Sequence, residues 1–146
     1  MQTNVLVVED SPLLHRMYEI VLQGYQRSEI KLSLAANGRE GLQRLAETPD
    51  TDVVFLDVNM PQMDGLEFLA RVKEEPTFRD IPVIIVSTED RQDDVDRGLE
   101  AGAREYLCKP FTPEQIYYAL DCVLRGREAA GDKPSESDDH PPKVSA

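Results

Sequence analysis

The sequence predicts an α/β fold in which one open parallel sheet is covered by helices on both faces. Three short apolar runs support this prediction, because they are rich in β-branched residues and lack the alternation of half-exposed strands. These runs are residues 5–8, 53–56 and 83–86. The segments between the strand candidates carry apolar residues at the spacing of a helix, so strand and helix alternate five times. Parallel neighbouring strands must be joined by crossover connections of this kind.

The first strand, residues 5–8, leads into a helix that is predicted to begin at Pro12. Ser11 is a favourable N-cap, and proline is well tolerated at the first helical position. Apolar residues then recur at helical spacing and mark one face of this helix for the core. They are Leu14, Met17, Tyr18, Val21, Leu22 and Tyr25.

Two further strand candidates, residues 31–35 and 105–108, are more polar than the three apolar runs. Polar strands suit the borders of a sheet, so we expect both of them near its edges. Apolar residues at helical spacing also place three helices between the remaining strands. These helices are centred on residues 41–45, 68–72 and 95–99.

The last helix is predicted to begin at Pro113, after the N-cap Thr112 and with Gln115 completing a capping box. Glycine, proline, serine and acidic residues then replace the helical pattern. We therefore predict one folded domain over residues 1–126, which is enough chain for a single core. Residues 127–146 are predicted to be a disordered acidic tail.

The composition excludes several classes of partner. The chain has 16 basic and 28 acidic residues and a formal net charge of −12, which repels phosphate backbones, so we expect no direct nucleic-acid binding. Its apolar runs are far shorter than the roughly 20 residues that span a bilayer, and no signal peptide opens it, so we expect a cytoplasmic protein without membrane insertion. Cys108 and Cys122 lack metal-ligand spacing and are expected to be reduced thiols.

Polar side chains follow four of the five predicted strands. They are Glu9 and Asp10 after the first strand, Asp57 after the third, Ser87 and Thr88 after the fourth, and Lys109 after the fifth. Ligands of open α/β sheets bind beyond the carboxyl ends of the strands, so we expect these residues to meet in one crevice.

Several acids in one crevice repel each other, which implies a divalent cation among them. Oxygen ligands without cysteine or histidine favour Mg²⁺ over zinc. Carboxylates beside a metal, a hydroxyl group and a lysine are suited to phosphoryl transfer. Asp57 is the best-placed acceptor, because it follows the most central and most hydrophobic run.

The chain also carries motifs that match a known family. They are Val7-Val-Glu-Asp10, Asp57-Val-Asn-Met-Pro-Gln-Met-Asp-Gly65, Val86-Ser87 and Ala101-Gly-Ala-Arg-Glu-Tyr-Leu-Cys-Lys-Pro-Phe111. Over roughly residues 4–125 the chain resembles the receiver domain of two-component response regulators, especially the stand-alone chemotaxis type. The resemblance implies a flavodoxin-like (βα)5 doubly wound parallel sheet with strand order 2-1-3-4-5.

The resemblance also implies a ligand set for Mg²⁺. Asp10 and Asp57 would bind the metal directly. Glu9 would act through water, and Asn59 would contribute its backbone carbonyl. In this family the residue at the position of Asp57 becomes the acyl phosphate.

The remaining site roles are likewise implied by the resemblance. Ser87 would donate a hydrogen bond to one phosphoryl oxygen, and Lys109 would pair with another. The family usually has a cis peptide bond before the proline at Pro110. Tyr106 would be the aromatic switch, whose ring turns inward once Ser87 has moved toward the phosphate.

Four further features of the sequence bear on how this site would work. Asn59 and Glu89 stand where the family tunes the lifetime of the phosphorylated state. Thr88 stands where a small alanine is more common, and narrower access to the phosphate and slower exchange are the two effects that its extra bulk could have. Tyr106 is preceded by Arg-Glu and not by the Asp-Asp of many transcription-factor receivers. We therefore expect a monomer, or a weak dimer that depends on phosphorylation.

The leading hypothesis is a single-domain response regulator that receives a phosphoryl group from a histidine kinase or phosphotransfer protein. Its protein target would bind the face formed by the fourth helix, fifth strand and fifth helix. Within this hypothesis, a phosphorelay intermediate or a phosphate sink are alternatives. A Mg²⁺-dependent aspartyl phosphatase usually needs a second Asp where this chain has Asn59, so we expect no enzymatic activity on external substrates. An unphosphorylated adaptor is the third hypothesis for the function.

His15 lacks the sequence context of a phosphotransfer helix and is expected to be an ordinary helix residue.

Overall fold

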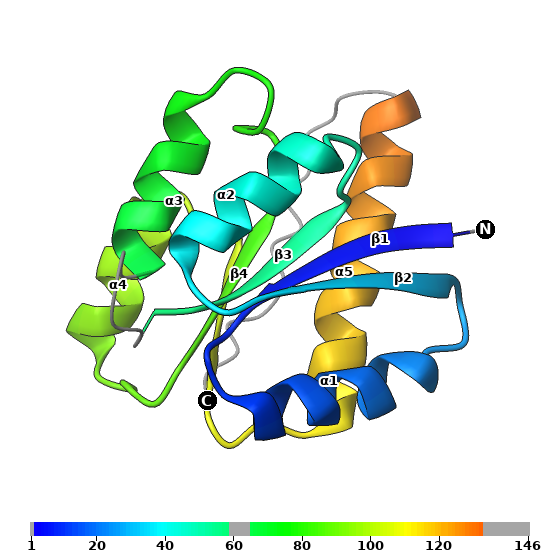
Figure 1. The fold of residues 1–146 in the computed structure, drawn as a ribbon, viewed down its shortest axis with the longest axis horizontal. Coiled ribbons are helices and arrows are strands. Elements are labelled where there is room, and N and C mark those ends of the chain that lie inside the picture. The colour runs from blue at the N-terminus through cyan, green and yellow to red at the C-terminus, as the bar shows by residue number, and fades with distance from the viewer. Residues whose placement is uncertain (1, 59–64, 133–146) are drawn as a thin grey trace.

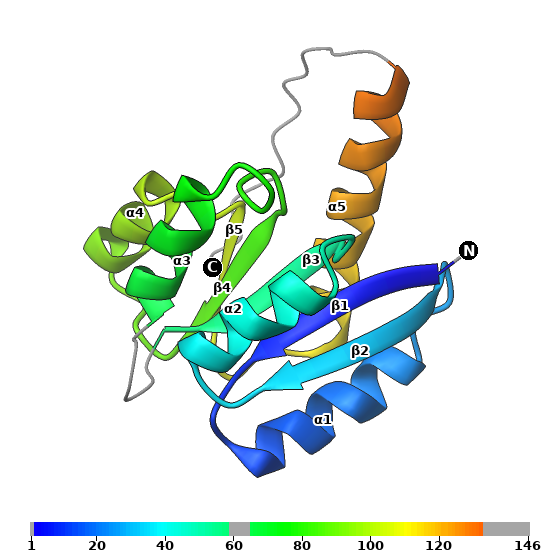
Figure 2. The same ribbon diagram turned by 45° about the horizontal axis from the view of Figure 1, so that its top comes forward.

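The computed structural model describes residues 2–58 and 65–132. Within these residues, five parallel strands form one sheet in the order β2-β1-β3-β4-β5, and helices cover both of its faces (Figure 1, Figure 2). The predicted flavodoxin-like (βα)5 fold and strand order 2-1-3-4-5 are therefore confirmed. The strands are β1 (Gln2–Val8), β2 (Glu29–Ala35), β3 (Val53–Asp57), β4 (Val83–Ser87) and β5 (Glu105–Cys108). The helices are α1 (Pro12–Gln23), α2 (Gly38–Glu47), α3 (Gly65–Glu74), α4 (Gln92–Glu100) and α5 (Pro113–Asp132).

Because all five strands are parallel and in register, their carboxyl ends lie together at one end of the sheet. β1 pairs with β3 so that Val8 lies opposite Leu56, and β3 pairs with β4 so that Asp57 lies opposite Val86. All five residues of β3 are buried, as expected for a central strand that is covered on both faces. The more polar β2 and β5 lie at the two edges, as the sequence predicts.

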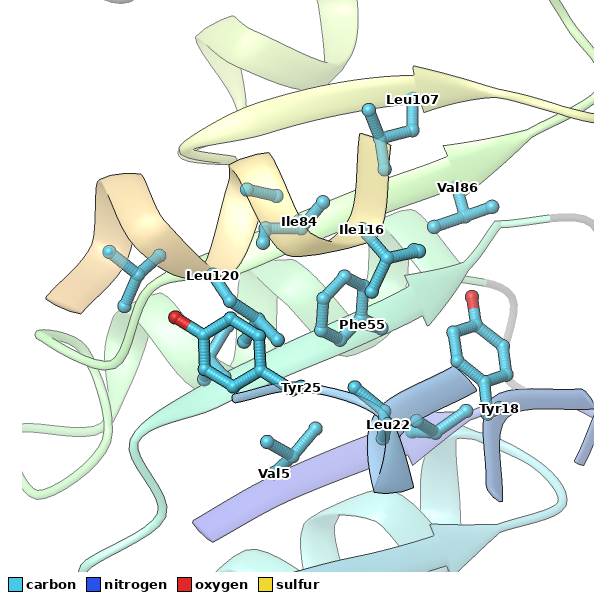
Figure 3. Packing of buried hydrophobic residues seen from close by; sticks show 14 of the residues in the cluster. Val5, Tyr18, Leu22, Tyr25, Phe55, Ile84, Val86, Leu107, Ile116 and Leu120 are labelled. Carbon is cyan, nitrogen blue, oxygen red and sulfur yellow. The ribbon is translucent and has the colours of Figure 1, made fainter. Parts of the chain in front are cut away.

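Two apolar clusters pack on opposite faces of this sheet. Figure 3 shows the first, in which Phe55 of β3 packs between Tyr18 of α1 and Ile116 of α5. The Tyr18 and Phe55 rings are tilted, with their centroids 5.8 Å apart, a favourable aromatic geometry. The second cluster contains Leu56, the next residue of β3, together with Phe68 of α3. Adjacent residues of β3 thus pack into the cores on opposite faces of the sheet, because the side chains of a strand alternate in direction.

The helix starts agree with their sequence signals. The Ser11 hydroxyl oxygen accepts a hydrogen bond of 3.2 Å from the Leu14 N–H, and Pro12 is the first residue of α1. At α5, Thr112 Oγ1 accepts from the Gln115 N–H at 3.2 Å, and Gln115 Oε1 accepts from the Thr112 N–H at 2.8 Å. Both predicted N-caps and the capping box are therefore confirmed.

The last helix is longer than the sequence analysis predicts. α5 continues to Asp132, so residues 127–132 are helical, and the prediction that the tail begins at residue 127 is wrong for this part. Residues 127–130 are Arg, Glu, Ala and Ala, all good helix formers, so the helix continues through them and through the glycine that follows. The remainder of the predicted tail, residues 133–146, lies outside the described residues. Across residues 2–58 and 65–132, none of the helices combines the length and the hydropathy that crossing a bilayer requires.

Candidate functional site

The carboxyl ends of the strands bring three acidic side chains together. Carboxylate oxygens of Glu9, Asp10 and Asp57 all lie within 4.8 Å of one another. Glu9 and Asp57 are buried, whereas Asp10, the second residue after the end of β1, is exposed. The predicted acidic cluster therefore exists, and it is open to solvent on the side of Asp10.

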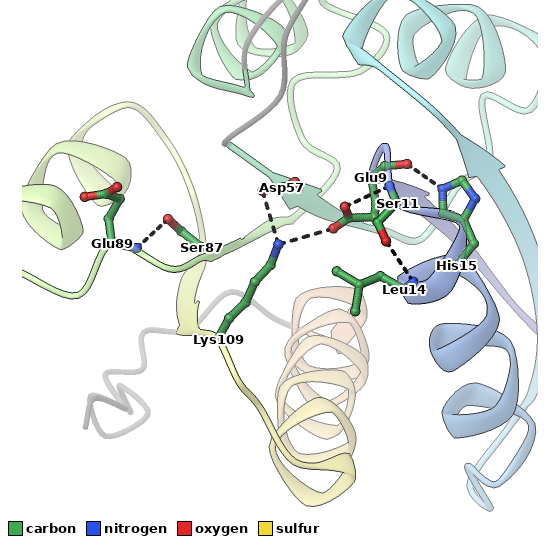
Figure 4. A network of polar contacts seen from close by, with 8 residues as sticks. All are labelled: Glu9, Ser11, Leu14, His15, Asp57, Ser87, Glu89 and Lys109. Atoms are coloured by element: carbon green, nitrogen blue, oxygen red, sulfur yellow. Dashed lines mark hydrogen bonds and ion pairs between the residues drawn. The ribbon is translucent and has the colours of Figure 1, made fainter.

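Lys109 approaches this cluster from the end of β5 (Figure 4). Its Nζ lies 3.4 Å from Glu9 Oε1 and 3.5 Å from Asp57 Oδ1, so one ammonium group is shared by two buried carboxylates. The Lys109 backbone N–H donates to the Ser87 carbonyl at 2.8 Å, and the Lys109–Pro110 peptide bond is cis, as the resemblance implies. The lysine head group is thereby placed where it can offset negative charge on Asp57.

Glu9 shows the electrostatic cost of this arrangement most directly. Burial and the nearby charge of Asp57 raise the pKa of the Glu9 carboxyl to about 7, although the Lys109 ammonium acts in the opposite direction. The Ser11 backbone N–H also donates to Glu9 Oε2 at 3.1 Å. A carboxyl group that resists ionisation beside two other acids is stabilised in its charged form by a cation. Three clustered carboxylates are the hard oxygen donors that Mg²⁺ prefers, so the donor set fits that metal.

A second group of contacts links Ser87 to Tyr106. The fully buried Ser87 hydroxyl oxygen accepts a hydrogen bond of 2.9 Å from the Glu89 backbone N–H. The Tyr106 hydroxyl donates to the Glu89 carbonyl at 2.8 Å, and the ring is only 8% exposed. The two proposed switch residues are therefore connected through the backbone of Glu89. The side chains of Thr88 and Glu89 are exposed beside the site.

Two site contributions were not predicted from the sequence. His15 of α1 contacts the Glu9 carbonyl through its imidazole Nε2, and the Ser11 N–H holds the Glu9 carboxylate. The signal for His15 is the helix start at Pro12, which places it in the first turn beside the end of β1. The predicted contribution of Asn59 lies outside the described residues.

Comparison with known proteins identifies the family to which this site belongs. The family model described as the response regulator receiver domain matches residues 5–121, which include every predicted site residue. The chain belongs to the response regulator receiver domain family. It is 35% identical over 122 residues to the chemotaxis protein CheY1 of Helicobacter pylori, an alignment that covers 82% of this chain and 95% of that relative.

Other receiver domains extend this similarity beyond one group of organisms. The two-component response regulator ORR5 of Oryza sativa is 32% identical over 122 residues, covering 84% of this chain and 89% of the relative. Among solved structures, the chemotaxis protein CheY4 of Vibrio cholerae has a TM-score of 0.74 and 33% identity, and the match covers 85% of this chain and 100% of that one. Receiver domains accept phosphoryl groups and bind Mg²⁺ at an acidic pocket, and the acidic cluster of this receiver is formed by Glu9, Asp10 and Asp57.

Proposed function

We propose that this receiver is a phosphorylation-operated switch in which a histidine kinase or phosphotransfer protein donates its phosphoryl group to Asp57 in the presence of Mg²⁺. One observation carries the proposal. The buried Asp57 carboxylate lies within 4.8 Å of two further acids, and the Lys109 ammonium is 3.5 Å from its Oδ1. An acceptor, a metal-binding donor set and a counter-charge thus meet at the carboxyl ends of β1, β3 and β5.

The transfer step needs no group beyond a phosphohistidine donor and the bound metal. A carboxylate oxygen of Asp57 attacks phosphorus, so that an O–P bond forms while the P–N bond to the donor imidazole breaks. The electron pair of that bond stays on the imidazole nitrogen, which takes up a proton. Lys109 offsets charge on one phosphoryl oxygen, and the Ser87 hydroxyl donates to another. Glu9, Asp10 and Asp57 would hold the Mg²⁺ ion, which would supply the remaining charge neutralisation.

The output would be a change of protein contacts at the face formed by α4, β5 and α5. In the described structure the Glu89 backbone joins the Ser87 hydroxyl to the Tyr106 hydroxyl, just before α4 begins. A Ser87 hydroxyl that turns toward a phosphoryl group gives up its contact with the Glu89 N–H. The start of α4 and the ring on β5 then respond together. A monomer, or a weak dimer that forms on phosphorylation, is the assembly that we propose.

The chemistry is proposed to act on the receiver itself and not on an external substrate. A phosphorelay intermediate or a phosphate sink would use the same acceptance step and remain the alternatives within this proposal. The similarity to proteins named for chemotaxis supports an output through protein contacts. An aspartyl phosphatase is disfavoured by Asn59, which stands two residues after Asp57 where such enzymes usually need an acid.

Small phosphodonors test this proposal directly. The full chain is incubated with acetyl phosphate and MgCl₂, and the intact mass is measured. One phosphoryl group is expected to add to the native protein, with no addition in Asp57→Asn or in the presence of EDTA. Asp50→Asn, at an exposed acid just before β3 and therefore at the amino ends of the strands, away from the site, is the matched control and should still be modified.

Each other result overturns the proposal in a different way. Continued turnover of an external phosphoester that requires Asp57 would indicate an aspartyl phosphatase. A chain that is never modified, by acetyl phosphate or by a phosphorylated histidine donor, would indicate an adaptor. Modification that persists in Asp57→Asn would place the acceptor elsewhere.

A further inference from the structure

The ring of Tyr106 lies against a gap in the side chains of α4. That gap is Gly98, a buried glycine within the helix. A Cβ atom at this position would lie 3.1 Å and 3.2 Å from Cδ2 and Cε2 of the Tyr106 ring, and 2.8 Å from Cδ1 of Ile85. These distances are shorter than ordinary van der Waals contacts. Any side chain larger than hydrogen would therefore compete with the ring for space.

The opposite end of the ring is held by a hydrogen bond. The Tyr106 hydroxyl donates to the Glu89 carbonyl. The Glu89 N–H in turn donates to the Ser87 hydroxyl oxygen. The ring is thus fixed at its edge by the backbone of α4 and at its hydroxyl by the segment that precedes α4. Moving the edge of the ring away from Gly98 would carry the hydroxyl away from the Glu89 carbonyl.

Gly98 lies in the last turn of α4, and its presence inside a helix needs a compensating reason, because among ordinary residues only proline is a poorer helix former. The φ angle of Gly98 is not positive, so its backbone conformation alone does not require glycine. Its packing offers the reason, since the space left by the missing side chain is occupied by Tyr106 and Ile85.

Of these two neighbours, Tyr106 has more freedom to move. Ile85 is fully buried in the central strand β4, among the residues of the second core. Tyr106 is on the edge strand β5 and lines, with Gly98 and Arg97, a surface pocket of about 260 Å³. Ile85 also borders this pocket, so a displacement of its side chain has to be distinguished from a displacement of the Tyr106 ring.

We propose that Gly98 is a positioning residue for Tyr106. The missing Cβ sets the balance between a buried ring that is bonded to Glu89 and a ring displaced toward solvent. The regulatory meaning of this balance rests on the proposed function, in which Tyr106 responds to phosphorylation at Asp57. The balance itself is a property of the unphosphorylated chain, and it can be measured without a phosphodonor.

The experiment compares two helical glycines in the full chain. Gly98→Ala places a methyl group against the Tyr106 ring. Gly126→Ala, in α5, is the matched control, because its Cβ would meet only the mobile end of Arg104, at 2.8 Å from Nη2. Both substitutions exchange glycine for the best helix former, so an effect of helix propensity alone should be common to both.

The readout is the exposure of the Tyr106 ring. Tyrosine is labelled with ¹³C at the ring, the Tyr106 resonance is assigned with Tyr106→Phe, and a soluble paramagnetic agent reports solvent contact. We expect Gly98→Ala to lower the ratio of buried to exposed ring about tenfold, which corresponds to about 1.4 kcal/mol. Gly126→Ala should leave the ratio unchanged.

Two results would overturn the inference. A ring that stays buried in Gly98→Ala shows that the glycine does not position it, and equal exposure in both variants shows a general effect of helix substitution. Ile85→Val combined with Gly98→Ala removes the Cδ1 contact but keeps both ring contacts. The ring should remain displaced in this double variant, whereas its return would assign the effect to Ile85.

The same samples separate this inference from the proposed function. Native chain and both glycine variants are treated with acetyl phosphate and MgCl₂ after the ring measurement. Absence of an adduct in the native chain would overturn the phosphorylation proposal and leave the ring result intact. An adduct in the native chain together with an unmoved ring in Gly98→Ala would overturn only the role of Gly98.

Discussion

Glu9 is a residue whose burial serves the site at the expense of the fold. Its side chain is 3% exposed, and it shares the Lys109 ammonium with the Asp57 carboxylate. Burial, together with the nearby charge of Asp57, outweighs the opposing effect of the Lys109 ammonium and raises the pKa of Glu9 to about 7. A site built to hold a cation is therefore destabilising when no cation is bound, a common exchange of stability for function.

Glu9→Gln should make the metal-free protein more stable above neutral pH. The Glu9 carboxyl titrates near 4.5 in the unfolded chain and near 7 in the folded one, so between these values the folded state binds more protons. The free energy of unfolding of the native protein should therefore fall as pH rises through this window, and it should stay low above it. Glutamine does not titrate, so the variant should lose this decline and gain on the order of 2 kcal/mol over the native protein near pH 8.

Urea unfolding in EDTA, at several pH values between about 5 and 8, measures this effect. Glu74→Gln, at an exposed acid of α3, controls for the loss of one negative charge and should show the native pH dependence. A Glu9→Gln protein that is less stable than native near pH 8, or that keeps the same decline, would contradict the prediction.

At the scale of elements, the helix starts connect local sequence signals to the site. The N-cap Ser11 orders the first turn of α1, and its backbone N–H also binds the Glu9 carboxylate. At α2, Asn37 Oδ1 accepts from the Glu40 N–H at 2.9 Å, while Glu40 Oε1 accepts from the Ala36 N–H at 2.8 Å. Such reciprocal contacts satisfy backbone donors that a helix start would otherwise leave unpaired.

Asn37→Ala should lower the free energy of unfolding by about 1 kcal/mol, because the Glu40 N–H then loses its acceptor. Asn37→Asp is the matched variant, since its carboxylate can accept the same hydrogen bond and also lies at the positive end of the helix dipole. Its stability should therefore be close to that of the native protein. Thermal and urea unfolding of the three proteins measure these differences, and an equal loss in both variants would mean that the side-chain oxygen is not the source of the cap's stability.

At the scale of the whole molecule, the sequence predicts the features that depend on hydrophobic periodicity and on the order of strands and helices. The three apolar runs and the convergence of Asp57 and Lys109 follow from how parallel strands are buried and connected. Three features escape such reasoning because they depend on contacts between distant segments or on gradual changes of propensity. These are the contact of His15 with Glu9, the packing of Gly98 against Tyr106 and the continuation of α5 to Asp132.

The two apolar cores lie on opposite faces of the sheet, and the same strands contribute side chains to both. In β4, Ile84 faces the core shared with α1 and α5, whereas Ile85 faces the core shared with α2 and α3. Both side chains are fully buried. Because one rigid sheet contributes to both cores, we expect the described domain to unfold in a single cooperative transition.

Ile84→Val and Ile85→Val test this cooperativity with the same chemical change on opposite faces of one strand. Each removes one buried methylene and should cost about 0.5–1.5 kcal/mol. If the domain is one unit, either substitution lowers the urea midpoint of the far-UV circular dichroism and of the tyrosine fluorescence equally, without a change in slope. Tyr18 lies in the first core and Tyr106 in the second. The fluorescence lost on Tyr18→Phe therefore reports the first face, and the fluorescence lost on Tyr106→Phe reports the second. Separate midpoints for the two faces would show that the sheet does not couple them.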